Sequence, residues 1–106
     1  MDQPTRNLFI ARARIMKALA HPTRLYIVEA VSQQEKCVQE LTDLIEADIS
    51  TVSKHLSVLK NADIVQAEKR GTQVYYRLKF RCVLQFFNCM ESVMKSSAED
   101  QSCLIP

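Results

Sequence analysis

The chain has 106 residues and a formal net charge of +2; 47% of its residues are hydrophobic and 25% are charged. This length and composition indicate one small globular domain and exclude a disordered segment. The sequence carries no signal peptide, no internal repeat and no apolar run long enough to span a bilayer, so we expect a cytoplasmic protein without a membrane partner. In that compartment its four cysteines favour ligands or sensors over structural disulfides.

The charges are distributed unevenly along the chain. Residues 29–48 are acidic, and Lys36 is the only basic residue among them. The acidic residues are Glu29, Glu35, Glu40, Asp43, Glu46 and Asp48. The half that follows is basic, through Lys54, Lys60, Lys69, Arg70, Arg77, Lys79 and Arg81. This asymmetry is expected of a protein with one face that meets phosphates and another that does not.

Residues 1–20 are predicted to form an N-terminal helix. Its apolar side chains fall on one stripe at helical spacing, and the basic residues Arg12, Arg14 and Lys17 lie mostly outside that stripe. The stripe consists of Leu8, Ala11, Ile15, Ala18 and Leu19. A stripe of this kind at a chain end indicates a helix that packs against a partner, and we assign it as a dimerisation helix.

Residues 39–60 are predicted to form a helix-turn-helix pair. The first helix, at 39–45, has apolar residues at spacings of three and four, and a short turn at 46–48 leads into the second helix, at 47–60. The apolar residues of the first helix are Leu41, Leu44 and Ile45. Asp48 is a suitable N-cap for the second helix, because its carboxylate can accept a hydrogen bond from an amide that lacks a partner within the helix.

The second helix has an apolar face and a polar face. Val52, Leu56 and Leu59 fall together at helical spacing and are expected to pack on a core. The opposite face holds short hydrogen-bonding or cationic side chains, which can approach a phosphate backbone and contact base edges. They are Ser50, Thr51, Ser53, Lys54, His55 and Ser57. We therefore predict that this helix reads double-stranded DNA.

Two strands, at 64–70 and 72–79, are predicted to follow as a hairpin. Val74, Tyr76 and Leu78 alternate with more polar residues, which is typical of a half-buried strand. Gly71, the only glycine in the chain, lies between the strands where a tight turn needs a positive φ. The fold class is therefore mainly α with a small β-hairpin, a winged helix-turn-helix in the order α-α-α-α-β-β-α with its core at 22–80.

Residues 81–95 are predicted to form a C-terminal dimerisation helix, with a flexible tail at 96–106. The helix is too apolar to bury only one narrow stripe, so it either buries two sides in the monomer core or meets a partner. Its apolar residues are Val83, Leu84, Phe86, Phe87, Met90, Val93 and Met94. In a two-fold dimer the reading helices would bind DNA half-sites about 10 bp apart, or a multiple of that distance.

Five segments in this order resemble the ArsR/SmtB family, and the resemblance covers residues 15 to 78. The segments are His21-Pro22-Thr23-Arg24-Leu25, Cys37-Val38, Glu40-Leu41, Thr51-Val52-Ser53-Lys54-His55-Leu56 and Val74-Tyr75-Tyr76-Arg77-Leu78. The family comprises small winged-helix repressors of bacteria and archaea that pair through their first and last helices. Its members release DNA when they bind a metal, a metalloid or another inducer. The resemblance implies a homodimeric, DNA-binding transcriptional repressor.

The predicted DNA contacts extend from the second helix of the pair to the wing. Arg70 and Gln73, beside the turn, are expected to contact the DNA backbone or the minor groove. His55 has two open interpretations, a direct DNA contact or a half-buried helix residue. Asp63 occupies a position where the family usually has glycine, and aspartate tolerates a left-handed cap better than most residues.

The cysteines are the candidates for an inducer site, with Cys37, Cys82 and Cys89 as the predicted ligands and Cys103 as a weaker fourth. The family's arsenic-type site uses a Cys-Val-Cys triplet, but this chain has Cys37 followed by valine and glutamine. Soft thiolates select thiophilic ions such as As(III), so we predict As(III) or another soft metal as inducer, with no organic cofactor. Cys82 and Cys89 are about 10.5 Å apart along a helix, so one small ion would need Cys37 or a second subunit.

Two alternatives to an As(III)-released repressor stay open. In the first, a repressor of the same fold switches by dithiol oxidation in response to redox or sulfide species. In the second, the winged-helix shape serves protein interaction without reading DNA. An enzyme is disfavoured, because the sequence has no CxxC or cysteine–histidine pairing and leaves little room for a substrate pocket.

Overall fold

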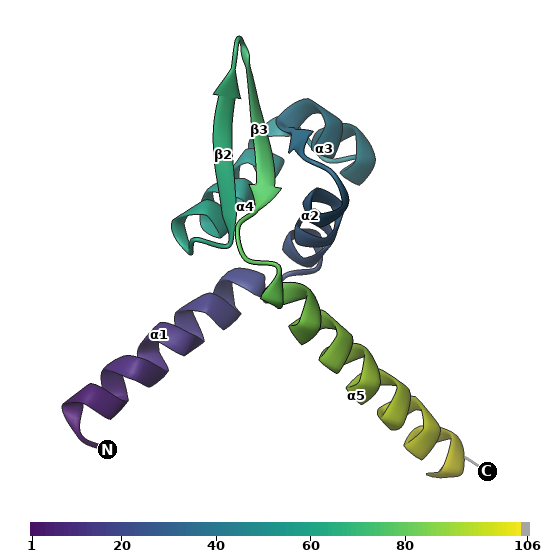
Figure 1. Cartoon of the computed structure of the whole chain (residues 1–106). Coiled ribbons are helices and arrows are strands. Elements are labelled where there is room, and N and C mark those ends of the chain that lie inside the picture. The colour runs from purple at the N-terminus through teal and green to yellow at the C-terminus, as the bar shows by residue number, and fades with distance from the viewer. Residues whose placement is uncertain (105–106) are drawn as a thin grey trace.

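The computed structural model describes the backbone of residues 1–104 and the side chains of residues 1–98. Its helices and strands form a winged core from which the first and last helices extend as two diverging arms (Figure 1). In chain order the elements are α1 (Gln3–Leu19), α2 (Pro22–Gln33), β1 (Lys36–Cys37), α3 (Val38–Ile45), α4 (Ile49–Asn61), β2 (Val65–Arg70), β3 (Gln73–Leu78) and α5 (Cys82–Leu104). The predicted fold class, a mainly helical winged helix-turn-helix, is confirmed.

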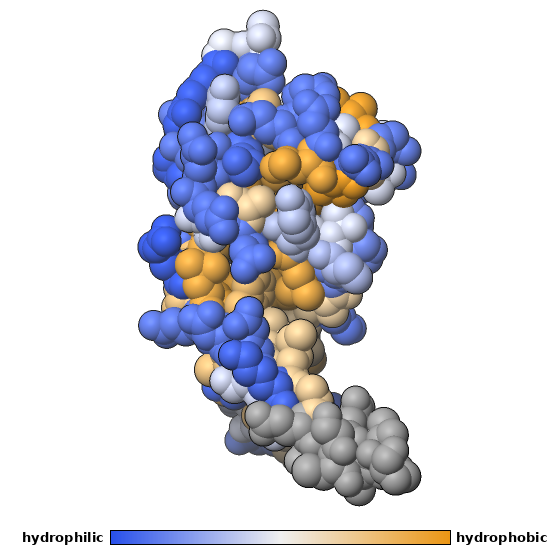
Figure 2. Space-filling view, turned by 90° about the vertical axis from the view of Figure 1, so that its right-hand side faces the viewer, coloured by the Kyte–Doolittle hydropathy of each residue, from blue (hydrophilic) through white to orange (hydrophobic). Residues whose placement is uncertain are grey.

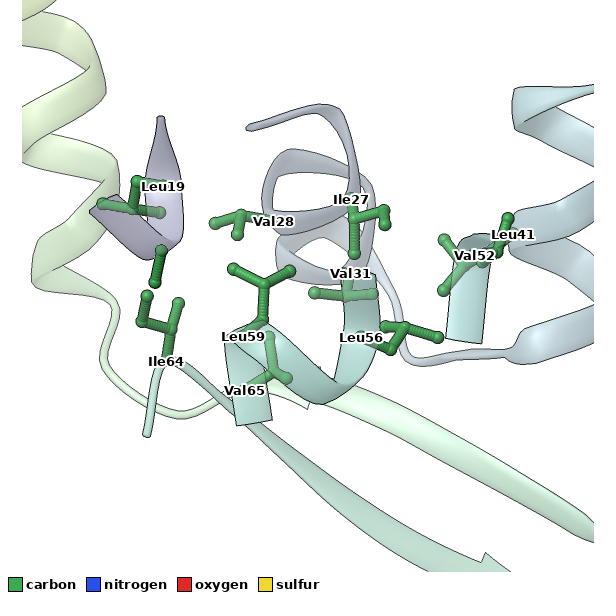
Figure 3. Close-up of a cluster of buried hydrophobic side chains, with 11 residues drawn as sticks. Leu19, Ile27, Val28, Val31, Leu41, Val52, Leu56, Leu59, Ile64 and Val65 are labelled. Carbon is green, nitrogen blue, oxygen red and sulfur yellow. The ribbon is translucent and has the colours of Figure 1, made fainter. Parts of the chain in front are cut away.

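The hydrophobic core lies where α2, α3, α4 and β2 meet (Figure 3). Val52, Leu56 and Leu59, the residues of α4 predicted to pack on a core, are all 0% exposed. Of the three apolar residues predicted for the preceding helix, Leu41 is 0% exposed, Ile45 is partly buried and Leu44 is 50% exposed. Each such side chain contributes about 1.5–3 kcal/mol when it is fully buried. This burial fixes which face of α4 points away from the core.

The ends of α4 are set by the two residues predicted for them. Asp48 is the N-cap, and its carboxylate accepts a hydrogen bond of 2.7 Å from the backbone N–H of Thr51. Hydrogen bonds from Thr51 and Ser50 hold the pKa of the Asp48 carboxyl below its usual value. Beyond the other end, Asp63 has a φ of 65°, the left-handed conformation expected for it. The chain can therefore turn from α4 directly into the wing.

The wing is the antiparallel hairpin of β2 and β3, and Gly71 at its turn has the predicted positive φ, 63°. A third strand, β1, pairs with β3 and places Cys37 opposite Tyr75, so the sheet order is β1-β3-β2. The predicted element order, which contained only the hairpin, is wrong at this point. A strand of two residues is too short to produce an alternation in the sequence.

The arms make the molecule more extended than a globular domain of this size. The radius of gyration is 16.7 Å, whereas a compact chain of this length is expected to have about 13 Å. On α1 the exposed apolar side chains include Phe9, Ile15 and Met16, at 51%, 47% and 56% of their surface. On α5, Val93 and Met94 are 65% and 67% exposed. About half or more of the surface of these side chains is therefore left uncovered by the same chain.

The end of α5 differs from the prediction. The sequence analysis ended this helix at 95 and assigned 96–106 to a flexible tail, but the helix continues to Leu104. The segment from Cys82 to Leu104 contains neither glycine nor proline, so nothing in it breaks the backbone hydrogen-bond ladder. None of the helices in the described residues is long and apolar enough to cross a membrane.

Candidate DNA interface

The outer face of α4 presents the polar side chains that the sequence predicted. Ser50, Thr51, Ser53, Lys54 and Ser57 are all exposed, on the side of the helix opposite its buried leucines. The Ser50 hydroxyl donates to the Asp48 carboxylate at 2.9 Å, which orients it at the first turn. Hydroxyls and one ammonium group on a rigidly packed helix can donate to phosphate oxygens and to base acceptors.

His55 lies at the edge of this face and is only half-exposed. Its imidazole stacks at a tilt on the ring of His21, with the ring centroids 4.4 Å apart. The Nδ1 atom of His55 is 3.2 Å from Nη1 of Arg24. Partial burial, His21 and Arg24 together hold the pKa of His55 below its usual value. The geometry favours the second of the two interpretations left open by the sequence, a half-buried helix residue.

Sequence reasoning did not identify Arg24 as a residue that contacts α4. Its guanidinium bridges three segments, since it donates to the carbonyl oxygens of Ala18 (2.6 Å) and Lys17 (3.2 Å) as well as lying beside His55. The only sequence signal was its position in the His21–Leu25 motif. That motif indicated a family resemblance and gave no hint of the long-range contact to α4.

The wing holds the other predicted contacts, Arg70 and Gln73, at the paired ends of β2 and β3 next to the turn. Hydrophilic side chains surround the wing tip, at the top of the view in Figure 2. Gln73 is exposed. The Arg70 guanidinium donates to the carboxylates of Glu35 (2.6 Å) and Glu68 (3.0 Å) and lies 4.9 Å from the centre of the Tyr75 ring.

These ion pairs of Arg70 are solvent-exposed, so each contributes little to stability. The hydrogen bond from Arg70 holds the pKa of Glu68 below its usual value, and the same bond raises that of Arg70. The Glu68 carboxylate is therefore ionised at neutral pH and partly neutralises the wing. A phosphate at the wing would compete with Glu35 and Glu68 for the guanidinium.

The structure does not bring the predicted thiolates together within one chain. Cys37 is 6% exposed and lies at the N-terminus of α3, where its backbone N–H donates to the Glu40 carboxylate at 3.0 Å. Cys82 and Cys89 are exposed on α5, and the side chain of Cys103 lies outside the described residues. Among the described residues, no group of three histidine, cysteine or acidic side chains could hold a metal ion.

An apolar groove of about 550 Å³ separates α1 from the start of α5. Phe9, Met16 and Leu19 line it from α1, and Cys82 and Phe86 line it from α5. The groove therefore lies between the two helices that were predicted to form the dimer, and both helices line it. Cys82, one of the predicted thiolate ligands, is thus among the residues that line this groove.

A sequence profile described as "Bacterial regulatory protein, arsR family" matches residues 21–67. The HTH-type transcriptional repressor SmtB of Mycobacterium tuberculosis is 39% identical over 75 residues, which make up 71% of this chain and 56% of that protein. The arsenical resistance operon repressor of Bacillus subtilis is 37% identical over 79 residues, 74% of this chain and 75% of that protein. The chain therefore spans little more than half the length of the first of these relatives.

Among solved structures, a similar fold is found in Mycobacterium bovis Mb0332, described as a homodimeric winged helix-turn-helix DNA-binding domain and a possible ArsR-family transcriptional regulator. The TM-score is 0.78 and the identity 29%, over 90% of this chain and 88% of that one. These relatives are described as transcriptional regulators, as the sequence predicted, and not as enzymes. The profile match, the relatives and the winged fold agree: this chain belongs to the ArsR/SmtB family of winged helix-turn-helix regulators.

Proposed function

We propose that this chain is a transcriptional repressor that binds double-stranded operator DNA as a homodimer. The observation that carries the proposal is the division of α4 into two faces. Val52, Leu56 and Leu59 are 0% exposed on one face, while exposed hydroxyls and the Lys54 ammonium occupy the other. A helix held this firmly can place those groups in a major groove, and the adjacent wing can contact the flanking backbone.

Dimerisation is the second part of the proposal, and the arms support it. An isolated monomer would leave the apolar faces of α1 and α5 in water, although burying each large apolar side chain gains about 1.5–3 kcal/mol. A two-fold axis through the arms would present two copies of α4 on one side of the dimer. Two such helices bind half-sites separated by about one helical turn of DNA, or by a multiple of it.

Selection from a pool of randomised DNA duplexes tests the DNA-binding part directly. We expect the purified chain to enrich an inverted repeat whose half-site centres are about 10 bp apart, or a multiple of that. Footprinting of the enriched site should protect two segments on one side of the duplex. Enrichment of single half-sites, or no enrichment at low salt, would contradict the proposed dimeric repressor.

The inducer part of the proposal is that cysteine thiolates capture As(III) or another soft ion and so release the DNA. The donor chemistry supports it, because exposed thiols on α5 suit thiophilic ions. The B. subtilis relative is described as an arsenical resistance operon repressor. Since one chain lacks three converging ligands among its described residues, we place the site at the dimer interface, with Cys82 or Cys89 from each subunit and Cys37 as a further candidate.

Titration of arsenite into the protein–DNA complex tests this part. We expect DNA release with the wild-type chain and a loss of the response when Cys82 or Cys89 is changed to serine, with Ser92→Ala on the same helix as the control. The coupling is reciprocal, so DNA should weaken arsenite binding by the same factor. If no soft ion releases DNA and the serine variants of Cys37, Cys82 and Cys89 all behave as wild type, the thiolate sensor is wrong.

Mass spectrometry of the same samples distinguishes the alternative switch, in which an oxidant such as polysulfide converts two thiols to a disulfide. In that reaction each thiol loses one proton and one electron, and the oxidant takes up the two electrons. Retained arsenic supports the As(III) sensor. A mass decrease of two hydrogens, or a gain of sulfur, that accompanies DNA release supports the redox- or sulfide-responsive repressor instead.

A further inference from the structure

The contact between Arg24 and His55 connects two parts of the molecule with different roles. Arg24 lies in the first turn of α2 and donates from Nε and Nη2 to the last carbonyl groups of α1, on Ala18 and Lys17. The third nitrogen, Nη1, lies 3.2 Å from Nδ1 of His55 in the middle of α4. The Arg24 guanidinium thus links the end of α1, a proposed dimerisation helix, to α4, the proposed DNA-reading helix.

The chemistry of the two partners determines which protonation state of His55 allows this contact. A guanidinium has only N–H donors and no acceptor, so Nδ1 of His55 must accept with its lone pair. A neutral imidazole with an acceptor at Nδ1 carries its proton on Nε2. The contact therefore exists only while His55 is neutral. Protonation at Nδ1 would convert the acceptor into a donor and break the bond.

The surroundings of His55 also oppose its protonation. Among the described residues, the charged and titratable groups that act on this ring are Arg24 and His21, and neither is an acid. His21 already uses its own Nδ1 to accept from the backbone N–H of Thr23 at 3.1 Å. A cationic His55 would then face a guanidinium and a neighbouring imidazole without any compensating carboxylate.

We propose that Arg24 is a positioning residue which holds α4 in its DNA-binding orientation relative to α1 by donating to neutral His55, so that protonation of His55 lets α4 shift relative to α1 and weakens DNA binding. This inference rests on the proposed DNA-binding function and adds a regulation to it. The sign of the pH effect is diagnostic. A histidine that contacted a phosphate directly would bind DNA more tightly once it became cationic.

The test is the affinity for the selected operator, measured by fluorescence anisotropy between pH 7.5 and pH 5.0 at constant ionic strength. The pKa of His55 is lowered in the folded chain, so the contact is complete above the ordinary histidine value of about 6.5 and is lost only as the pH falls through the lowered pKa of the folded chain. We expect the affinity of the dimer to fall by at least about threefold over this range. Circular dichroism at each pH verifies that the chain stays folded.

Two variants and a matched control separate positioning from general effects of acid. His55→Asn places an acceptor near the former Nδ1 and cannot titrate, so the ratio of affinities at pH 7.5 and pH 5.0 should approach one. In Arg24→Lys a single ammonium group replaces the three guanidinium nitrogens. We therefore expect about tenfold weaker operator binding at pH 7.5 and little further loss of affinity in acid. His21→Asn removes the neighbouring imidazole but remains a good N-cap, and should keep the pH dependence.

The outcomes distinguish this inference from the function on which it rests. No binding at any pH would overturn both. Tight binding at pH 7.5 that stays constant or strengthens in acid would overturn the positioning role alone. A direct check is the tautomer of His55 at pH 7.5 by NMR of the imidazole nitrogens, because a proton on Nδ1 at that pH would contradict the proposal without reference to DNA.

Discussion

Changing Lys54 to glutamate is expected to weaken operator binding by about 100-fold or more at moderate salt. Lys54 lies on the exposed face of α4, so in the proposed complex each subunit loses one cation beside the DNA and gains a repelling carboxylate. The neutral variant Lys54→Gln should reduce the slope of log affinity against log salt concentration by about 2 for the dimer, since each phosphate contact contributes about 0.9. Salt titrations by fluorescence anisotropy measure both effects.

Lys95→Glu is the matched control for this charge reversal. Lys95 is exposed on α5, in the arm that extends away from the wing (Figure 1). The same change of charge at this distance should alter the affinity by only a small factor, because it is screened at ordinary ionic strength. If Lys54→Glu and Lys95→Glu weaken binding equally, the effect reflects net charge, and α4 is not the DNA-contacting helix.

Changing Met16 to glutamate is expected to convert the dimer into a monomer and to reduce operator affinity by about 100-fold. Met16 is 56% exposed and lines the apolar groove between α1 and α5. A carboxylate there would be buried without a partner once a second subunit packed on the arms, which costs several kcal/mol. The DNA affinity falls with it because the two half-sites are no longer bound by one linked pair of helices.

Leu44→Glu provides the control for Met16→Glu. Leu44 is 50% exposed, but it lies on α3 in the winged core rather than on an arm. Sedimentation equilibrium should show a dimer for this variant and for the wild type, and a monomer for Met16→Glu. If Met16→Glu remains dimeric and binds DNA normally, the subunits do not pair through the groove between α1 and α5.

The helix-turn-helix and the wing could be predicted from the sequence because their signals are local. The spacing of Val52, Leu56 and Leu59 predicted the buried face of α4, and Gly71 predicted the turn of the wing. The cap residue Asp48 fixed where α4 begins. Patterns of this kind depend on a few neighbouring residues, so they can be interpreted without knowledge of the tertiary structure.

The features that escaped prediction depend on contacts between distant segments. Strand β1 exists because Lys36 and Cys37 pair with β3, almost 40 residues later in the chain. The contact between Arg24 and His55 joins residues 31 positions apart, and no periodic pattern in the sequence predicts such a contact. The interpretation of His55 stayed open for the same reason, since its burial is decided by the position of α2.

The extended arms link folding of this chain to its concentration. A monomer exposes much of the apolar faces of α1 and α5, so in the proposed dimer these helices would gain stability when two chains meet. At low abundance the population would then shift toward chains whose outer helices fray and which are open to proteolysis. If the proposed dimer forms, a cell that makes few copies would thereby limit how much DNA-binding protein it holds.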